Sequence, residues 1–227
     1  MLVRAITPIH VGDAELRRRQ RRYDRLAPAG LSVDLVDLPA DSDVPRSLET
    51  ADDVHASERC VVAEARQSDP ERYEAVLPDC VLDPGVGGPA AEVPVPTYGI
   101  LRLTVDLLAG LDLRFGAVAR NQAIADALTA RVLAYGLGGC FTRTAVLDLD
   151  FEAITDAAAW RGALDAAGRS FAAERTAAVV NGCSAVEVGE AGEGAVVLDP
   201  TAVALRLLFL ASRYRLTRTR AGQAATS

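Results

Sequence analysis

The stretch Ala75-Val76-Leu77-Pro78-Asp79-Cys80 has a counterpart about half a chain later, Ala177-Ala178-Val179-Val180-Asn181-Gly182-Cys183. Each is a short apolar run that ends on a cysteine, which predicts a buried strand followed by a tight loop. In an open parallel α/β sheet, ligands bind at the carboxyl ends of the strands. Two thiols at two such ends can lie on opposite faces of one small molecule, where one removes a proton and the other returns it.

Strand-like and helix-like segments alternate along the rest of the chain. Apolar runs predict strands at residues 2–7, 31–38, 75–80, 93–96, 115–119, 141–149, 177–181 and 196–198. Helical spacing with flanking caps and breakers predicts helices at residues 13–26, 50–67, 100–109, 121–135, 158–175 and 199–214. Such alternation is typical of βαβ units with a parallel sheet, so the predicted fold class is α/β.

The pattern of the first half starts again near Phe115, and each round contains one strand that ends on a cysteine. We therefore predict two pseudo-symmetric Rossmann-like domains with parallel sheets and an active-site cleft between them. The first domain is expected to comprise residues 1–100 together with 205–227 and to carry Cys80. The second is expected to comprise residues 101–204 and to carry Cys183.

The composition narrows the possible functions. Half of the 227 residues are hydrophobic, yet no apolar run reaches the roughly 18 residues that a membrane span needs. The first residues lack the long apolar core and cleavage site of a signal peptide, which predicts a cytoplasmic protein with free thiols. The net charge of −7 argues against nucleic-acid binding. The arginine-rich run at residues 17–22 is interpreted as a solvated helix face.

All basic residues are arginine, because the sequence contains no lysine. This excludes a pyridoxal phosphate aldimine and a Walker phosphate loop, both of which need a lysine amine. His10 and His55 are the only histidines, and neither occurs in a recognised metal-binding spacing. The chemistry is therefore left to cysteines, carboxylates, hydroxyls and backbone dipoles. We expect a small-molecule substrate, no cofactor and no metal.

Three motifs resemble those of a known group, the aspartate/glutamate/hydantoin racemase superfamily. Cys80-Val81-Leu82-Asp83-Pro84-Gly85-Val86 is similar to the first-cysteine loop of its hydantoin racemase branch, Cys-x-x-Asp-Pro-Gly-Leu. Val180-Asn181-Gly182-Cys183-Ser184-Ala185 is similar to the second-cysteine loop, and Pro45-Arg46-Ser47-Leu48-Glu49 to a segment ahead of the second helix. The order and spacing agree over nearly the whole chain, and the first motif is the most specific.

The resemblance implies a cofactor-independent racemase or epimerase that acts on a carbon next to a carbonyl group, in a hydantoin or an amino-acid-like substrate. Cys80 and Cys183 would be catalytic, one abstracting a proton as thiolate and the other donating a proton to the opposite face. A thiol suits both roles because its ordinary pKa, about 8.5, lies close to working pH. The resemblance also implies a homo-oligomer.

Other residues are expected around the substrate. Each cysteine should lie near a helix N-terminus, whose backbone N–H groups favour a thiolate and bind a carbonyl oxygen. The predicted substrate-binding residues are Pro8, Ile9, His10, Ser47, Val81, Leu82, Tyr98, Ser184 and Ala185. Cys60 and Cys140 lie outside the paired motifs and are interpreted as structural. Arg102 and Arg120 would either bind an anionic group or be solvated.

The sequence also departs from the pattern of the superfamily. Thr7-Pro8-Ile9-His10 stands where members commonly have Asn-Pro-Asn and a hydroxyl residue, which makes the binding end more apolar. Pro78 lies within what should be a buried central strand, where it cannot donate a ladder hydrogen bond. Other functions therefore stay open: a cis-trans isomerase or decarboxylase of the same superfamily, or a non-catalytic small-molecule-binding relative.

Overall fold

The computed structural model describes residues 1–41, 43–87, 93–189 and 194–217. Its strands are β1 (Leu2–Ile6), β2 (Ser32–Val36), β3 (Ala75–Pro78), β4 (Phe115–Ala119), β5 (Phe141–Val146), β6 (Ala178–Asn181) and β7 (Val196–Leu198). Its α-helices are α1 (Asp13–Leu26), α2 (Ala51–Ala65), α3 (Ile100–Gly110), α4 (Gln122–Ala134), α5 (Ala157–Ala173) and α6 (Pro200–Arg213). The predicted alternation of strands and helices, and with it the α/β fold class, is confirmed.

Two segments differ from the prediction. The strand expected at residues 93–96 does not form; within the described ranges, a single bridge pairs Val76 with Thr97 instead. Prolines inside that segment lack the N–H that a ladder needs. A short 3₁₀ helix, η2 (Glu152–Thr155), follows β5 and was not predicted. The side chain of Asp150 accepts a backbone hydrogen bond from its first turn, as a helix cap does.

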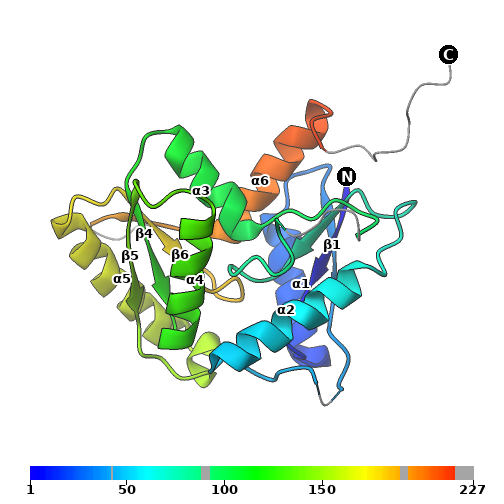
Figure 1. The fold of residues 1–227 in the computed structure, drawn as a ribbon, viewed down its shortest axis with the longest axis horizontal. Coiled ribbons are helices and arrows are strands. Elements are labelled where there is room, and N and C mark those ends of the chain that lie inside the picture. Colours follow the sequence, from blue (N-terminus) through cyan, green and yellow to red (C-terminus); the bar gives the residue numbers. More distant parts are fainter. Residues whose placement is uncertain (42, 88–92, 190–193, 218–227) are drawn as a thin grey trace.

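The strands form two parallel sheets with the same order. In the described part of the chain, β1 is the middle strand of a three-stranded sheet, β2-β1-β3. β4 has the same position in a four-stranded sheet, β5-β4-β6-β7. Figure 1 shows the two sheets in separate lobes of the molecule. This equivalence pairs β3 with β6, the two strands that lead into Cys80 and Cys183.

Helices join the two lobes on both sides. The last helix, α6, packs against α3 and also contacts α1, so the end of the chain returns toward the first lobe. On another side, α2 of the first lobe contacts α4 of the second, and Figure 1 shows the start of α2 close to α4 in the lower half of the view. The lobes are therefore held together by helices that are far apart in the sequence. The exact domain limits stay a prediction.

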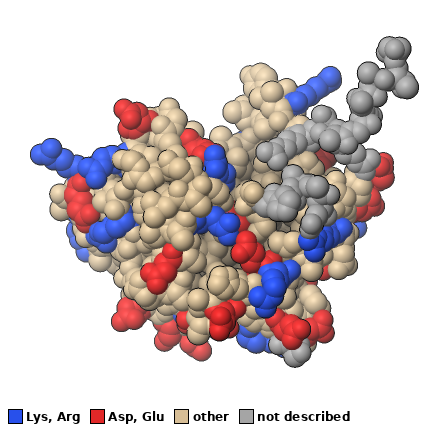
Figure 2. Space-filling model, in the orientation of Figure 1, with Lys and Arg blue, Asp and Glu red and all other residues tan. Residues whose placement is uncertain are grey.

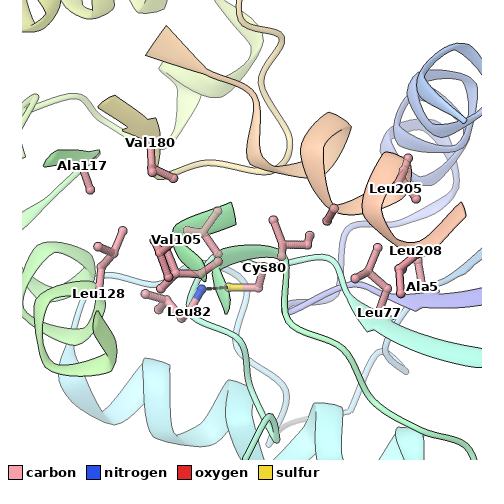
Figure 3. Packing of buried hydrophobic residues seen from close by; sticks show 14 of the residues in the cluster. Ala5, Leu77, Cys80, Leu82, Val105, Ala117, Leu128, Val180, Leu205 and Leu208 are labelled. Carbon is pink, nitrogen blue, oxygen red and sulfur yellow. Dashed lines mark hydrogen bonds between the residues drawn. The ribbon is translucent and has the colours of Figure 1, made fainter. Parts of the chain in front are cut away.

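One hydrophobic cluster contains residues from both sheets. It includes Ala5 and Leu77 from the first sheet and Ala117 and Val180 from the second. Figure 3 shows Cys80 between these two groups of residues. Because the apolar core is continuous from one lobe to the other, burial of apolar surface stabilises the interface of the lobes as well as each lobe.

The position of Pro78 corrects the expectation of a buried central strand. β3 is an edge strand, because β1 lies between β2 and β3. Asp79 N donates a hydrogen bond to Ile6 O on the inner side, whereas Val76 N donates on the outer side, to Pro96 O. Successive backbone nitrogens of a strand point to opposite sides, so the nitrogen of Pro78, like that of Val76, faces the outer edge. Within the described ranges no neighbouring strand lies there, and the N–H that proline lacks costs no hydrogen bond between strands.

Charged side chains are spread over the outside of the molecule. Figure 2 shows arginines and acidic residues interspersed over the face that it presents. Among the arginines, Arg4, Arg19, Arg22 and Arg120 are exceptions, because they are buried. Among the described residues, every helix is too short or too polar to cross a lipid bilayer. A buried arginine needs hydrogen-bond or ion-pair partners inside the protein. Two of the buried arginines, Arg19 and Arg120, line the cavity described next.

Candidate active site

Loops that follow the carboxyl ends of β1, β3, β4 and β6 line one cavity. The first lobe contributes Pro8, Ile9, Arg19, Leu48, Cys80, Val81 and Leu82. The second contributes Arg120, Ile124, Phe151, Ile154, Gly182, Cys183, Ser184 and Ala185. The cavity volume is about 60 Å³, whereas one buried water needs roughly 10–15 Å³ on such a measure. The cavity therefore has room for a small ring with a short substituent.

Cys80 lies in the turn that follows β3, and its side chain is almost fully buried. The backbone N–H of Leu82 donates a hydrogen bond to its Sγ over 3.5 Å, drawn as the dashed line in Figure 3. Burial raises the pKa of the Cys80 thiol to about 12; the Leu82 hydrogen bond opposes this rise, and the carboxylates of Asp79 and Asp83 add to it. Cys80 is therefore a thiol at neutral pH.

Cys183 follows β6 and is partly buried. Gly182, just before it, passes so close to β4 that an added Cβ would lie 1.9 Å from Val118 O, so only glycine fits there. Burial raises the pKa of the Cys183 thiol, whereas the Arg19 guanidinium and the N–H of Ala185 oppose that rise. Cys183 thus has a positively charged neighbour, whereas the carboxylates of Asp79 and Asp83, and Cys183 itself, raise the pKa of Cys80.

Turns, rather than helix N-termini, follow both cysteines in the described ranges, which corrects the expectation of a helix start at each thiol. Residues 81–82 and 184–185 are in turns, and the next helices begin only at Ile100 and at Pro200. Each turn nevertheless supplies one backbone N–H to its own cysteine. A single N–H favours a thiolate in the same direction as a helix dipole.

Arg19 connects the two cysteine turns. Its side chain is 5% exposed and forms ion pairs with Glu15, through Nε at 2.8 Å, and with Asp79, through Nη1 at 3.0 Å. Tyr23 also donates a hydrogen bond to Asp79, at 2.8 Å. Burial lowers the pKa of the Arg19 guanidinium, but the carboxylates of Asp79 and Glu15 together raise it by more, so the net shift of the pKa is upward. A permanent positive charge is therefore fixed at the cavity.

The interpretation of residues 17–22 as a solvated helix face is wrong for much of this run. Arg18 and Arg22 donate hydrogen bonds to backbone carbonyl oxygens of the segment 185–187, at 2.9 and 3.1 Å. Arg25 forms an ion pair with the glutamate of the same segment. Helix α1 of the first lobe thus holds the turn that carries Cys183. The sequence gives no sign of this, because the partners are about 160 residues away.

The predicted substrate-binding residues separate into two groups. Pro8, Ile9, Val81, Leu82, Ser184 and Ala185 line the cavity together with both cysteines. Among the described residues, His10, Ser47 and Tyr98 are not part of its lining. His10 is drawn away because its Nδ1 lies 2.8 Å from Leu38 O and 3.1 Å from the Asp37 carboxylate. The residue after Ser47, Leu48, occupies the cavity wall instead.

Arg120, at the end of β4, is a cavity residue whose role the sequence left undecided. Its side chain is 5% exposed and pairs with Glu49. It also donates hydrogen bonds to Leu48 O and to Leu149 O, each at 3.2 Å. Asn121 donates a further bond to Leu48 O at 2.7 Å. These residues form a bridge between the lobes at the cavity, so Arg120 is neither solvated nor unpaired.

Several apolar wall residues were not predicted. They are Leu48, Ile124, Phe151 and Ile154. In the sequence each looks like an ordinary core residue, because an apolar side chain that lines a cavity has the same pattern as one that fills a core. Together these four side chains make part of the cavity lining apolar.

Asp83 anchors the first-cysteine turn. Its carboxylate is fully buried and accepts hydrogen bonds from Leu101 N at 2.9 Å, from Arg102 N at 2.7 Å and from Tyr135 OH at 2.8 Å. Burial raises the pKa of Asp83 to about 6, while these hydrogen bonds lower it. An added Cβ at Gly99 would lie 2.2 Å from the carboxylate. The Asp of the Cys-x-x-Asp motif therefore joins the turn to the start of α3.

The two remaining cysteines lie elsewhere. The Sγ of Cys60 lies 3.7 Å from Asp43 O, and the Sγ of Cys140 lies 3.3 Å from Leu137 O. Neither lines the cavity. Across the described ranges, no three histidine, cysteine, aspartate or glutamate side chains gather in a way that could hold a metal ion. What the cavity brings together is two thiols, the two turns that carry them, and two paired arginines.

Comparison with known proteins relates this geometry to a family. The family model described as Asp/Glu/Hydantoin racemase matches residues 16–208. No curated protein sequence matches the chain. The match to the family model covers both cysteine turns and every strand from β2 to β7.

Solved structures share the whole fold. An allantoin racemase from Pseudomonas fluorescens is 15% identical, with a TM-score of 0.81 over 100% of this chain and 99% of that one. An allantoin racemase from Klebsiella pneumoniae is 17% identical, with a TM-score of 0.75 over 100% and 96%. A maleate cis-trans isomerase from Nocardia farcinica is 18% identical, with a TM-score of 0.59 over 93% and 92%. At these identities the likeness establishes the fold alone.

Proposed function

This chain belongs to the Asp/Glu/hydantoin racemase family, and we propose that it is a cofactor-independent racemase or epimerase that inverts a carbon next to a carbonyl group. One observation carries the proposal: Cys80 and Cys183 line the same cavity. They follow β3 and β6, which have equivalent positions in the two sheets. A thiol from each lobe is the arrangement that a two-sided proton transfer needs.

In the proposed reaction, one cysteine is a thiolate and the other a thiol. The thiolate takes the α-proton, and the electron pair of the broken C–H bond moves into an enolate. The thiol gives its proton to the opposite face of the same carbon, which restores the C–H bond with inverted configuration. The pair starts and ends with one proton and one negative charge, so no other reactant is consumed. The roles are exchanged for the other enantiomer.

The turns after the cysteines are proposed to stabilise the enolate. Val81, Leu82, Ser184 and Ala185 all line the cavity. Backbone N–H groups in such turns can bind the carbonyl oxygen as negative charge develops on it. One well-placed donor of this kind typically contributes about 10²–10³-fold to the rate. We propose that these turns supply the electrostatic part of catalysis and the cysteines supply the proton transfers.

The charges at the cavity favour an uncharged substrate. Arg19 pairs with Glu15 and Asp79, and Arg120 pairs with Glu49, so both guanidinium groups already have carboxylate partners. A free amino acid would bring another carboxylate, which also opposes carbanion formation. A hydantoin has a C5 proton next to a carbonyl group in a neutral ring, and allantoin contains such a ring. We therefore propose a hydantoin-like substrate.

Proton exchange with solvent deuterium tests the function. Allantoin, hydantoins with alkyl or aryl groups at C5, and free amino acids are each incubated with the protein in deuterium oxide, and the α-proton is followed by NMR. We expect faster loss of that signal than in protein-free samples, together with loss of optical activity. Cys80→Ser and Cys183→Ser should each block abstraction from one enantiomer and lower racemisation about 10²–10⁴-fold. Cys140→Ser is the matched control and should react normally.

Other outcomes would contradict the proposal in distinct ways. Normal racemisation by both cysteine variants would exclude the two-thiol mechanism. A stable substrate adduct on Cys80, seen by mass spectrometry, would indicate covalent isomerisation instead. A ligand that raises the melting temperature without exchange or product would indicate a binding protein without catalysis.

A further inference from the structure

The two cysteines of the cavity have opposite electrostatic surroundings. Asp79 directly precedes Cys80, and Asp83 follows it three residues later; both carboxylates are buried. Arg19 lines the same cavity as Cys183, and its guanidinium opposes the rise of the Cys183 pKa that burial causes. The Cys80 turn thus contains two carboxylates of its own, whereas Arg18 and Arg22 of α1 donate hydrogen bonds to carbonyl oxygens of the Cys183 turn.

The position of Arg19 is fixed from two directions. Glu15, one helical turn earlier on α1, accepts a hydrogen bond from its Nε, and Asp79 of the first-cysteine turn accepts one from Nη1. The Arg19 side chain is 5% exposed and Asp79 1%. A guanidinium held in this way cannot rotate into solvent without leaving Asp79 unpaired and buried, which is costly. Arg19 therefore presents a fixed positive charge to the cavity.

Charged groups from two elements act on Cys183, whose pKa is raised above all by burial. Arg19 and Arg22 come from α1 and favour the thiolate, and the N–H of Ala185 does the same from its own turn. Asp79, from the turn after β3, disfavours it. Because Asp79 is itself paired with Arg19, its negative charge is partly compensated where it faces Cys183. Burial raises the pKa of both thiols, but arginine side chains oppose this rise only at Cys183, so we expect Cys183 to have the lower pKa.

We propose that Arg19 is a positioning residue whose guanidinium stabilises the thiolate of Cys183, so that Cys183 is the base and Cys80 the acid of the resting protein. This inference rests on the proposed two-thiol function and assigns the roles within it. The resting form would accept the enantiomer whose α-proton faces Cys183. After one inversion the proton lies on Cys183 and the thiolate on Cys80, and proton exchange with water restores the resting form.

Alkylation of the unliganded protein tests the assignment without any substrate. Iodoacetamide reacts with thiolates, and peptide mass spectrometry gives the rate at each cysteine separately as a function of pH. We expect the rate at Cys183 to reach half its maximum at a lower pH than the rate at Cys80. The midpoint is compared, rather than the maximal rate, because access to the two sulfurs differs. An equal or lower midpoint at Cys80 in the unmodified protein would overturn the proposal.

Variants of Arg19 then test the cause. Arg19→Gln should raise the Cys183 midpoint by about one pH unit, which slows alkylation about tenfold at lower pH. Arg19→Lys keeps the charge and should recover part of the shift, although it loses the fork geometry. Arg17→Gln, on the exposed side of the same helix, is the matched control and should leave the midpoint unchanged. A folded Arg19→Gln protein with an unchanged midpoint would contradict the proposal.

The two proposals can fail separately. If no substrate in the panel shows α-proton exchange, the proposed function is wrong, yet the two alkylation midpoints still measure the charge asymmetry. If exchange is found but the Cys80 midpoint is the lower one, the function stands and the assignment of base and acid is reversed.

Discussion

Ser184 Oγ donates a hydrogen bond of 2.7 Å to the backbone carbonyl oxygen of Asp79. Ser184 follows Cys183 and Asp79 precedes Cys80, so this bond joins the two cysteine turns directly across the lobes. Both residues are buried, and water does not compete for the bond. Ser184 therefore helps to set how far apart the two turns lie.

The first prediction concerns this bond. Ser184→Ala should lower the free energy of unfolding by about 1 kcal/mol, because a buried hydrogen bond is lost and Asp79 O is left without this donor. We expect a larger effect on the rate of α-proton exchange, about tenfold, because small misplacements of reacting groups are costly. Urea unfolding and NMR exchange measure the two quantities. Ser212→Ala, near the end of α6, is the control; equal exchange rates in both variants would contradict the role of Ser184.

A second prediction compares two glycines, Gly99 at the N-cap of α3 and Gly110 at the end of the same helix. Gly99→Ala would place a Cβ 2.2 Å from the Asp83 carboxylate, which must then move. We expect a loss of about 1–3 kcal/mol in the free energy of unfolding, and slower exchange because Asp83 anchors the first-cysteine turn. Gly110→Ala meets no atom within 4 Å and should stabilise the helix by up to about 1 kcal/mol. Equal effects of the two substitutions would show that Asp83 is not held against α3.

A third prediction follows from the raised pKa of Asp83, about 6 in the folded protein. An aspartate in the unfolded chain has a pKa near 3.9, so between about pH 4 and 6 the folded state binds more protons at this residue. Its contribution to stability is therefore full below about pH 4 and falls as the pH rises to 6, by at most about 1.4 kcal/mol per pH unit.

Asp83→Asn isolates this contribution. The variant cannot titrate at position 83, so its stability relative to the unmodified protein should improve as the pH rises from 4 to 6. Urea unfolding of both proteins at several pH values measures the difference, in which the titration of all other groups cancels. A difference that stays constant, or that changes in the opposite direction, would mean that the carboxylate is charged throughout.

The fourth prediction concerns the start of α6. Asp199 caps this helix and pairs with Arg22 at 2.7 Å, and the Arg22 side chain is only 2% exposed. Asp199→Ala leaves a buried guanidinium without its carboxylate, which typically costs about 3–5 kcal/mol. Asp13→Ala, at the exposed start of α1, should change stability by less than about 0.5 kcal/mol. A small effect at both positions in urea unfolding would contradict the importance of the buried pair.

The elements could be predicted from the sequence because local patterns determine them. The strand at Phe115–Ala119 and the helix after Asp199 have the predicted bounds to within a residue or two. Apolar runs, caps and breakers are local signals, and the repeated strand-then-cysteine pattern predicted two like sheets. The strand expected at residues 93–96 was wrong because Pro94 and Pro96 lack the backbone N–H groups that strand pairing needs, which outweighs the apolar valines beside them.

The site was harder to predict because its contacts join distant parts of the chain. Cys80 and Cys183 could be paired from the sequence, since each ends a similar strand. Arg19 could not, because an arginine in a basic run looks solvated until Asp79 is known to lie beside it. His10 follows β1, as a site residue would, yet the Asp37 carboxylate draws it away. The sheet order that puts Pro78 on an edge is equally invisible in the sequence.

The outer side of β3 also disfavours self-association by strand pairing. Val76 is already hydrogen-bonded on that side to the segment 96–98, and Pro78 offers no donor to a newcomer. A strand from another molecule therefore could not extend this sheet beyond β3, and strand addition at an open edge is the usual route to aggregation. Copies of the chain that pair strand to strand would have to use a different edge strand, such as β2, β5 or β7.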